Sequence, residues 1–255
     1  MSSADDAPPN PAEPSEAILS LFPAGVRAAE LRTAGDAALL SEAERRCVDR
    51  AAPKRVQEFA AGRLCARRAL AELGIHNFPL LSARDRQPLW PAAAVGSISH
   101  TQGYCAAVVG LQTQFAGLGL DTESSAAVGA ELWPQICTAQ ELALLHALAP
   151  AGRVRAASLI FSAKEAFYKC QYPITAEWLE FTDISIEPDS WQLDAGRYVV
   201  RPARPLQLVA EHYQPLQGRF RFHDGFVSSG FALVRLVVPK HLEGGLEQDL
   251  DIEHR

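Results

Sequence analysis

Residues 94–121 read AVGSISHTQGYCAAVVGLQTQFAGLGLD, and this stretch predicts three β-strands that follow one another. Apolar and β-branched residues are frequent in 94–99, 104–111 and 115–121, and the short turns Thr-Gln-Gly and Gln-Thr-Gln separate the three ranges. Turns of this length join antiparallel neighbours. The stretch therefore predicts a meander, in which each strand pairs with the next.

Helical patterns lie on both sides of this β-rich stretch. Thr138 and Glu141 form a capping-box pattern that predicts a helix through Leu148. Further predicted helices are 38–48, 54–73 and 154–170, and further predicted strands are 79–81, 182–187, 198–200, 219–223 and 226–238. Helices followed by strands occur twice along the chain, although no fixed-period repeat is visible.

The composition is that of an ordinary folded protein. Of the 255 residues, 48% are hydrophobic and 21% are charged, which excludes a chain too polar to build a core. No apolar run approaches the roughly 20 residues that a membrane helix requires. Residues 1–16 are rich in Ala, Pro, Ser and acidic residues, and they lack the apolar segment of a secretion signal. We expect no membrane span and a disordered N-terminal tail.

The cysteines and the net charge restrict the compartment and the partners. The five cysteines are widely spaced, without the pairing of a zinc site or the density of a disulfide scaffold. We expect reduced thiols and a cytoplasmic protein. The net charge of −6 argues against a general nucleic-acid binder. Residues 45–86 nevertheless contain ten basic and four acidic residues, and this segment could hold a multiply phosphorylated small ligand. The alternative is a solvated basic helix surface, which we favour for Arg45, Arg46, Arg50 and Arg68.

Three acidic side chains predict a metal site. Asp121 and Glu123 end the third predicted strand, where alternate side chains share a face. Glu165 falls on the inward face of the predicted helix 154–170. Inward carboxylates repel one another unless a counter-ion is present, and oxygen ligands of this kind suit Mg²⁺. The alternative is structural: Asp121 and Glu123 are exposed charges, and Glu165 pairs with Lys169 one helical turn away.

Basic and hydroxyl residues leave similar alternatives open. If residues 54–73 form one helix, Arg63 and Arg67 lie within its apolar stripe, where a guanidinium needs a core carboxylate or a ligand phosphate. The pair Ser99-His100 does not predict a serine hydrolase, because neighbours on a strand point to opposite faces and no Gly-x-Ser-x-Gly elbow surrounds Ser99. His100 by itself is typical of a buried or turn histidine.

Five short segments occur in a fixed order: RVQEFAAGR (55–63), PLWP (88–91), GSISH (96–100), GLDTE (119–123) and FSAKEAFYK (161–169). This ordered set resembles the 4'-phosphopantetheinyl transferases of the surfactin- and enterobactin-synthetase-activating type. The resemblance covers residues 55–172. Asp-x-Glu or a Lys-Glu helix is weak evidence by itself, whereas the ordered set is specific.

The resemblance implies an architecture. It predicts an α+β pseudo-dimer, that is, two similar α+β halves in one chain, which has little need to dimerise. We expect a monomer that acts without nucleic acid or membrane. The predicted divisions are a disordered tail at 1–15, an N-terminal half at 16–118, a C-terminal half at 119–240 and an acidic mobile tail at 241–255.

The resemblance also implies a reaction and its residues. Such an enzyme moves the phosphopantetheine arm of coenzyme A to a serine hydroxyl of an apo acyl- or peptidyl-carrier protein and releases 3',5'-adenosine diphosphate. By resemblance, Asp121, Glu123 and Glu165 hold Mg²⁺, and Glu165 is also the candidate base. Lys169 stabilises the transferring phosphoryl group. Coenzyme A is bound by Arg55, Arg63, Ser99, His100 and Lys169.

Two other functions stay open. A Mg²⁺-dependent nucleotide or coenzyme A pyrophosphatase would share the carboxylates but would use water as the nucleophile. A non-catalytic module that binds carrier proteins would carry a dead site, and the joint presence of Asp121, Glu123, Glu165 and Lys169 argues against it. No motif tells which carrier protein is served, in fatty acid, polyketide, siderophore or peptide synthesis.

Overall fold

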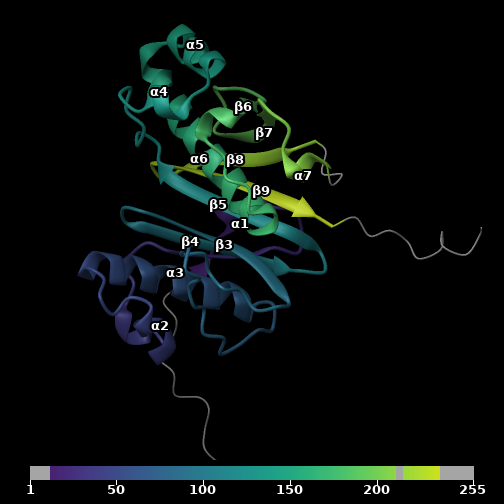
Figure 1. The fold of residues 1–255 in the computed structure, drawn as a ribbon. Coiled ribbons are helices and arrows are strands. Elements are labelled where there is room, and N and C mark those ends of the chain that lie inside the picture. Colours follow the sequence, from purple (N-terminus) through teal and green to yellow (C-terminus); the bar gives the residue numbers. More distant parts are fainter. Residues whose placement is uncertain (1–11, 211–214, 236–255) are drawn as a thin grey trace, which may run out of the picture.

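Two antiparallel sheets form the centre of the computed structural model, which describes residues 12–210 and 215–235 (Figure 1). The strand orders are β1-β2-β4-β3 and β5-β9-β8-β7-β6. The elements are β1 (Glu13–Pro14), α1 (Glu16–Leu19), β2 (Arg27–Leu31), η1 (Ala37–Leu39), α2 (Glu42–Arg46), α3 (Pro53–Ala71), β3 (Ala94–Thr101), β4 (Tyr104–Leu111), β5 (Phe115–Ser124), α4 (Trp133–Ile136), α5 (Ala139–Ala147), α6 (Pro150–Thr175), η2 (Phe181–Asp183), β6 (Ile184–Pro188), β7 (Ala195–Pro202), α7 (Gln207–Ala210), β8 (Gln217–His223) and β9 (Phe226–Val234).

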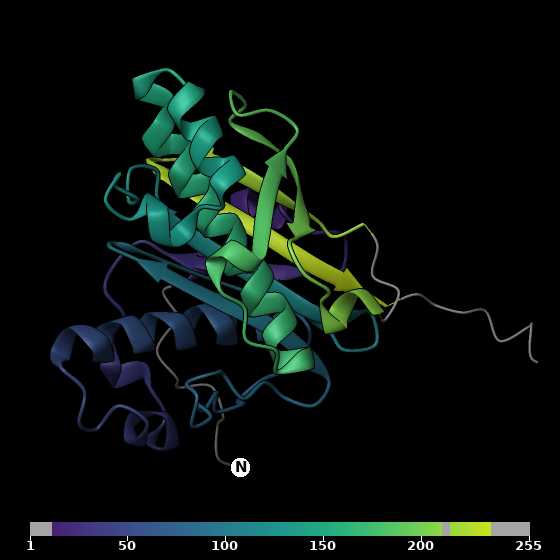
Figure 2. The same cartoon turned by 45° about the horizontal axis from the view of Figure 1, so that its top comes forward.

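One long helix accompanies each sheet. In Figures 1 and 2, α3 and α6 lie on opposite sides of the pair of sheets. Helix α3 buries Leu64 and Leu70 in a core with the first sheet, and α6 packs Phe167 edge-on against Phe231 of β9. A third core joins α1 to strands of both sheets, and includes Ile18, Val108 and Leu120. The predicted α+β fold with two halves is confirmed.

The third strand of the predicted meander does not pair with the second. β3 and β4 pair as predicted, from Ala94 opposite Leu111 to Thr101 opposite Tyr104. The other edge of β4 is taken by β2, a strand that the sequence did not predict. β5 therefore has no free edge of β4 to join, and it pairs with β9 in the second sheet. The predicted three-strand meander was wrong for this reason.

Other elements differ from the prediction mainly at their ends. Residues 79–81 form no strand, and the nearest pairing is an isolated bridge between Ser82 and Pro88. The predicted helix 38–48 is divided into η1 and α2, because Ser41 begins a new helix through a capping box with Glu44. Helix α6 is longer than predicted and ends at Thr175, and the next residue, Ala176, has a left-handed φ of 52°.

The predicted tails lie largely outside the described residues. The structure does not describe residues 1–11 or residues 241–255, and it also omits residues 236–238 at the end of the predicted strand 226–238. Within the predicted tail 1–15, Glu13–Pro14 forms β1 and Ser15 caps α1. The predicted division after residue 118 stays a prediction, and Phe115–Ser124 is one continuous strand of the second sheet.

Polar contacts connect the two halves beside the core. Glu30 on β2 accepts hydrogen bonds from Ser15 at 2.6 Å and from Tyr104 at 2.8 Å. Arg32 donates to Glu30 at 2.9 Å and to Asp224, between β8 and β9, at 2.8 Å. Burial raises the pKa of Glu30, but the hydrogen bonds from Ser15, Tyr104 and Arg32 outweigh burial and lower this pKa.

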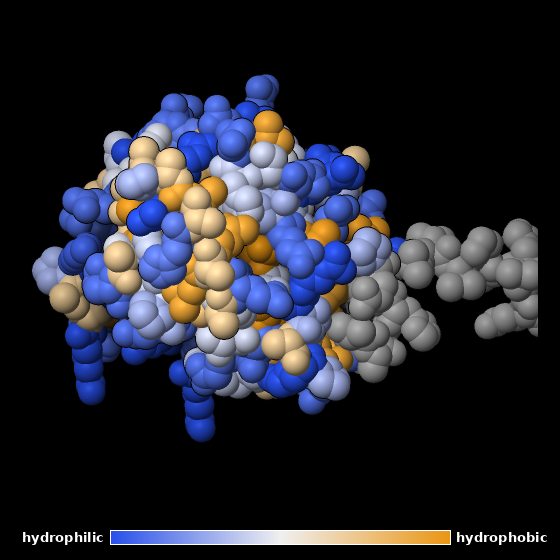
Figure 3. Space-filling model, turned by 90° about the horizontal axis from the view of Figure 1, so that it is seen from above, coloured by the Kyte–Doolittle hydropathy of each residue, from blue (hydrophilic) through white to orange (hydrophobic). Residues whose placement is uncertain are grey.

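The described surface is mixed. Figure 3 shows a band of apolar residues among hydrophilic ones on the face seen from above. None of the helices within the described ranges combines the length and apolar character that crossing a membrane requires. Among all the described residues, the exposed large apolar side chains are Leu89, Leu132, Ile174, Trp178, Leu193 and Val234.

Candidate active site

Strand β5 carries its acidic residues toward α6. Residues 117, 119, 121 and 123 share one face of this strand because side chains alternate. At Gly119, a Cβ atom would overlap the main-chain oxygen of Ala166 on α6, so only glycine lets the helix lie this close. The close approach brings polar side chains of α6 over Asp121.

Lys169 links the strand to the helix. Its Nζ lies 2.6 Å from Asp121 Oδ1 and 3.9 Å from Glu165 Oε2. Burial disfavours the charged amine, but Asp121 and Glu165 outweigh burial and raise the pKa of Lys169. Lys169 is therefore a cation at neutral pH. The ion pair with Glu165 that the sequence left open is present, and Asp121 is the nearer partner.

The Asp121 carboxylate is held at one oxygen and free at the other. The residue is 2% exposed. Oδ1 accepts a hydrogen bond from Ser99 Oγ at 3.1 Å in addition to the bond from Lys169, and Ser162 Oγ on α6 donates to the Asp121 main-chain oxygen at 3.3 Å. Oδ2 is buried and has no hydrogen-bond partner among residues 12–210 and 215–235. A buried carboxylate oxygen without a donor is a position that a cation would satisfy.

The neighbouring carboxylates repel one another. Burial raises the pKa of Glu123 to about 7, and the charges of Asp121 and Glu165 add to the increase. Burial, followed by Asp121, also raises the pKa of Glu165, although Lys169 opposes the shift. Burial is the main cause of both shifts, and a divalent cation would favour the charged carboxylates in this partly buried place.

The donor chemistry of this cluster fits a hard cation. Asp121, Glu123 and Glu165 offer carboxylate oxygens, the ligands that Mg²⁺ prefers, and Asp121 Oδ2 is unpartnered within the described chain. The described residues contain no group of three or more His, Cys, Asp or Glu side chains already arranged to hold a metal. Lys169 is the counter-ion of the cluster in this arrangement.

His100 and Arg55 come together at the end of β3. His100 Nε2 lies 3.0 Å from Arg55 Nη1 and 3.9 Å from Glu58 Oε2. Burial lowers the pKa of His100, Glu58 opposes the shift, and Arg55 and Lys169 reinforce it. A cavity of about 180 Å³ beside His100 is also lined by Lys54 and Glu58. Ser99, the residue before His100, bonds to Asp121, and this contact links the end of β3 to the carboxylates.

Two residues predicted to bind coenzyme A are engaged within the fold. Arg63 is 6% exposed, and it donates to the Leu80 main-chain oxygen at 3.0 Å and to Ser82 Oγ at 2.8 Å. Burial lowers its pKa to about 10. Ser99 is 2% exposed and bonds to Asp121. Their part in coenzyme A binding stays a prediction.

Two ion pairs, each with a buried carboxylate, stabilise the helices that carry the site. Arg67 lies 2.7 Å from Glu44, so its anion is a core carboxylate, one of the two alternatives that the sequence left open. Lys164 is 1% exposed and lies 2.7 Å from Glu141, the capping-box residue of α5. Sequence reasoning gave Lys164 no role. One signal was available in the sequence. Lys164 precedes Lys169 by five residues, which places the two side chains about 140° apart around a helix, so they face different surroundings.

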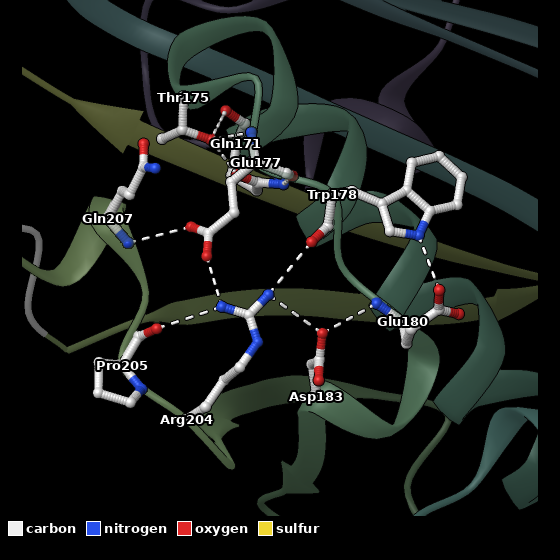
Figure 4. A network of polar contacts seen from close by, with 9 residues as sticks. All are labelled: Gln171, Thr175, Glu177, Trp178, Glu180, Asp183, Arg204, Pro205 and Gln207. Carbon is white, nitrogen blue, oxygen red and sulfur yellow. Dashed lines mark hydrogen bonds and ion pairs between the residues drawn. The ribbon is translucent and has the colours of Figure 1, made fainter.

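Arg204 fixes the segment that follows α6 (Figure 4). It lies 2.5 Å from Glu177 and 3.1 Å from Asp183, and it donates to the Trp178 main-chain oxygen at 3.1 Å. The Trp178 ring stands edge-on to Tyr168, with 5.6 Å between ring centroids. The network therefore places an exposed tryptophan beside the residue that precedes Lys169.

A cavity lies between the two halves, next to Lys169. It encloses about 300 Å³ and is lined by Trp90 from the first half and by Tyr168 and Lys169 from the second. Arg86 also lines it, and its φ of 71° is left-handed, a backbone region that favours glycine. A larger cavity of about 700 Å³ lies in the first half and is lined by none of the predicted site residues. The cavity of about 300 Å³ thus reaches the site through Lys169, the residue that pairs with Asp121.

Comparison with known proteins gives matches to both halves. The family model described as the 4'-phosphopantetheinyl transferase N-terminal domain matches residues 43–110, and the model of the 4'-phosphopantetheinyl transferase superfamily matches residues 117–221. The 4'-phosphopantetheinyl transferase Svp of Streptomyces mobaraensis is 35% identical over 197 residues, which cover 76% of this chain and 79% of Svp. PptT of Mycobacterium tuberculosis is 36% identical over 191 residues, or 73% and 82% of the two chains. Enterobactin synthase component D of Salmonella typhimurium is 40% identical over 119 residues, or 46% and 48%.

Proposed function

Because the chain belongs to the 4'-phosphopantetheinyl transferase superfamily, we propose that it transfers the phosphopantetheine arm of coenzyme A to a serine of an apo carrier protein. The serine oxygen forms a bond to the phosphorus that bears the arm, the pyrophosphate bond breaks, and 3',5'-adenosine diphosphate leaves. The observation that carries this proposal is the buried Asp121 carboxylate, paired with Lys169 at 2.6 Å beside the cavity between the halves.

Lys169 is suited to the phosphoryl group. Its ammonium is fixed by Asp121 and Glu165, and their charges raise its pKa, so it carries a positive charge that needs little reorganisation. In phosphoryl transfer, charge spreads over the phosphoryl oxygens in the transition state. We assign Lys169 to the stabilisation of those oxygens, and therefore to the rate of the reaction.

Asp121, Glu123 and Glu165 are the residues that would hold Mg²⁺. When bound, such an ion clamps a diphosphate and offsets charge on the leaving group. The support for this assignment is the donor set, the buried Asp121 Oδ2 and the burial of Glu123 and Glu165, which raises their pKa values. Asp121→Ala should abolish Mg²⁺-dependent transfer while the protein stays folded, and normal transfer by this variant would contradict the assignment.

Glu165 is also the candidate base for the serine proton. It lies on the exposed side of the cluster relative to Asp121, with 28% of its side chain accessible against 3% for Asp121. The proton would pass to a Glu165 oxygen directly or through one water.

The adenosine phosphates are assigned to the basic end of the site. His100 and Arg55 are side by side at the end of β3, and Lys54 lines the same small cavity. These groups offer donors and positive charge to a phosphate. We further propose a cytoplasmic monomer, in keeping with the absence of disulfides among the described cysteines and with two α+β halves in one chain.

Intact-mass spectrometry of an apo acyl-carrier protein tests the function. The carrier is incubated with this protein, coenzyme A and Mg²⁺, with a chelator control and a carrier whose acceptor serine is replaced by alanine. We expect a Mg²⁺-dependent gain of one phosphopantetheine on the unmodified carrier alone. If coenzyme A is cleaved but carriers from several pathways stay unlabelled, the protein is a pyrophosphatase instead. If no labelled carrier and no cleaved coenzyme A are found, the protein is a binding module.

A further inference from the structure

The two sheets meet where β3 lies beside β5, and serine side chains connect these strands. Ser97 Oγ accepts a hydrogen bond from the Leu120 N–H at 3.0 Å, and Ser99 Oγ accepts one from the Thr122 N–H at 3.0 Å. β3 pairs only with β4, and β5 only with β9, through backbone ladders within the described sheets. The serine hydroxyls thus satisfy N–H groups on the edge of β5 that faces away from β9. We refer to this contact as the serine seam.

The two serines of the seam differ in the acceptor to which each hydroxyl donates its hydrogen. A hydroxyl has one hydrogen to donate. Ser97 Oγ lies 3.5 Å from the Leu120 main-chain oxygen, so its contacts stay within the backbone of one residue. Ser99 Oγ lies 3.1 Å from Asp121 Oδ1 and donates to that carboxylate. Both serines are buried, at 5% and 2% exposure, so water does not compete for these bonds.

Ser99 and Lys169 approach the same oxygen of Asp121 from different halves of the protein. Ser99 comes from β3 of the first sheet, and Lys169 comes from α6 over the second. Two donors on Oδ1 fix the plane of the carboxylate and leave Oδ2 as the oxygen without a partner in the described chain. Ser99 thereby determines which way the unpartnered oxygen points.

The position of Ser99 opposes a direct contact with coenzyme A. Its side chain faces β5, whereas its neighbour His100 points the other way on the strand and reaches Arg55. One of its lone pairs accepts the Thr122 N–H, and its hydrogen is donated to Asp121. A phosphate, which accepts hydrogen bonds, could bind Ser99 Oγ only after the buried bond to Asp121 broke.

We propose that Ser99 is a positioning residue that holds Asp121 in the orientation its metal role requires, and that it is not a coenzyme A ligand. This inference rests on the proposed function, because it assigns Mg²⁺ to Asp121. Through Ser99, the first half of the chain would thus take part in the metal site, although it supplies no metal ligand. Groups that orient a metal ligand commonly change metal affinity or activity by about 10–100-fold when removed.

Ser99→Ala and Ser97→Ala provide a matched test, because each removes one hydroxyl from the seam and only Ser99 touches a carboxylate. Three quantities are measured on each full-length variant: the Mg²⁺ concentration for half-maximal transfer, the KM for coenzyme A, and Mg²⁺ binding to the coenzyme A complex by titration calorimetry. We expect Ser99→Ala to weaken Mg²⁺ binding at least tenfold in both metal measurements with little change in the KM. Ser97→Ala should leave Mg²⁺ binding unchanged, and Ser99→Thr, which restores a hydroxyl, should recover most of it.

Two results would overturn the proposal. Equal Mg²⁺ binding by Ser99→Ala, Ser97→Ala and the parent protein would show that Ser99 does not orient Asp121. A rise in the coenzyme A KM alone in Ser99→Ala would show that Ser99 is a coenzyme A ligand. Chemical unfolding of Ser99→Ala and Ser97→Ala reports whether either variant has lost its fold. If one has, Mg²⁺ binding is compared between Ser99→Thr and the parent protein instead. Failure of the proposed function is seen separately, in the parent protein, as transfer that is absent or independent of Mg²⁺.

Discussion

Replacement of Lys164 by methionine should destabilise the protein strongly, because it leaves a buried carboxylate without its cation. Lys164 Nζ donates to Glu141 at 2.7 Å and to the main-chain oxygens of Ile136 and Phe181 at 2.9 and 2.8 Å. Glu141 is 4% exposed, so water cannot replace the lost ammonium. Breaking a buried pair by removal of one partner costs about 3–5 kcal/mol. For a domain of this size, that loss corresponds to a fall in Tm of roughly 6–20 °C.

Equilibrium unfolding in urea measures this loss, and three further variants interpret it. Glu141→Gln removes the opposite charge, and the double variant should lose less than the sum of the two single changes, because neither charge is then left alone. Arg201→Ala is the exposed control: Arg201 pairs with Glu187 at 2.8 Å, with both side chains more than half exposed, and should cost less than about 1 kcal/mol.

The folded fraction of Lys164→Met should retain its turnover at low temperature. Lys164 faces α4, α5 and η2, while Lys169 faces Asp121. Unchanged unfolding together with lost transfer would refute the structural role and place Lys164 in the reaction.

Lys169→Ala should lower kcat more than it raises the KM for coenzyme A; equal effects would make Lys169 a binding residue. Gly119→Ala should cost about 1–3 kcal/mol of unfolding free energy, because the added methyl group overlaps α6. At Gly152 an added Cβ meets no atom within 4 Å, so Gly152→Ala should stabilise α6 by roughly 0.5–1 kcal/mol. Both are read from urea midpoints, and similar values would contradict the packing of α6 on β5. Glu30→Gln should flatten the acid dependence of stability: the lowered pKa of Glu30 contributes stability above its ordinary value of 4.5, and this contribution is lost as pH falls through the folded-state pKa. Parallel urea midpoints for parent and variant on acidification would refute it. Ser229→Ala should raise stability by about 1 kcal/mol, since this fully buried hydroxyl has no hydrogen-bond partner in the described ranges; a loss of stability would mean that the hydroxyl is satisfied.

Much of the candidate site could be predicted from local patterns. The two-residue period of a strand put Asp121 and Glu123 on one face, and the helical period put Glu165 and Lys169 together, as the structure has them. The capping box of Thr138 was equally local and is present with both of its hydrogen bonds. These features depend on residues a few positions apart, whose relative directions are fixed by backbone geometry alone.

The pairing of β5 could not be predicted in this way. A short turn after β4 favours a hairpin, but a strand has two edges, and β2 and β3 occupy both edges of β4. Whether a local preference is realised therefore depends on which distant segment takes the competing edge. The same applies to Arg67, where the sequence showed the need for an anion and the structure shows Glu44 as that anion.

Local patterns in the chain specify the charged residues that turn toward the interior, the helix and strand periods that direct them, and a motif order typical of one enzyme family. Their partners depend on the three-dimensional packing: Lys164 pairs with the structural carboxylate of Glu141, Lys169 pairs with Asp121, and the Ser99 hydroxyl binds the same Asp121 from the other half of the chain. Backbone periodicity acts over a few residues, whereas hydrogen bonds and ion pairs in a low-dielectric interior form between segments that packing brings together from far apart in the chain.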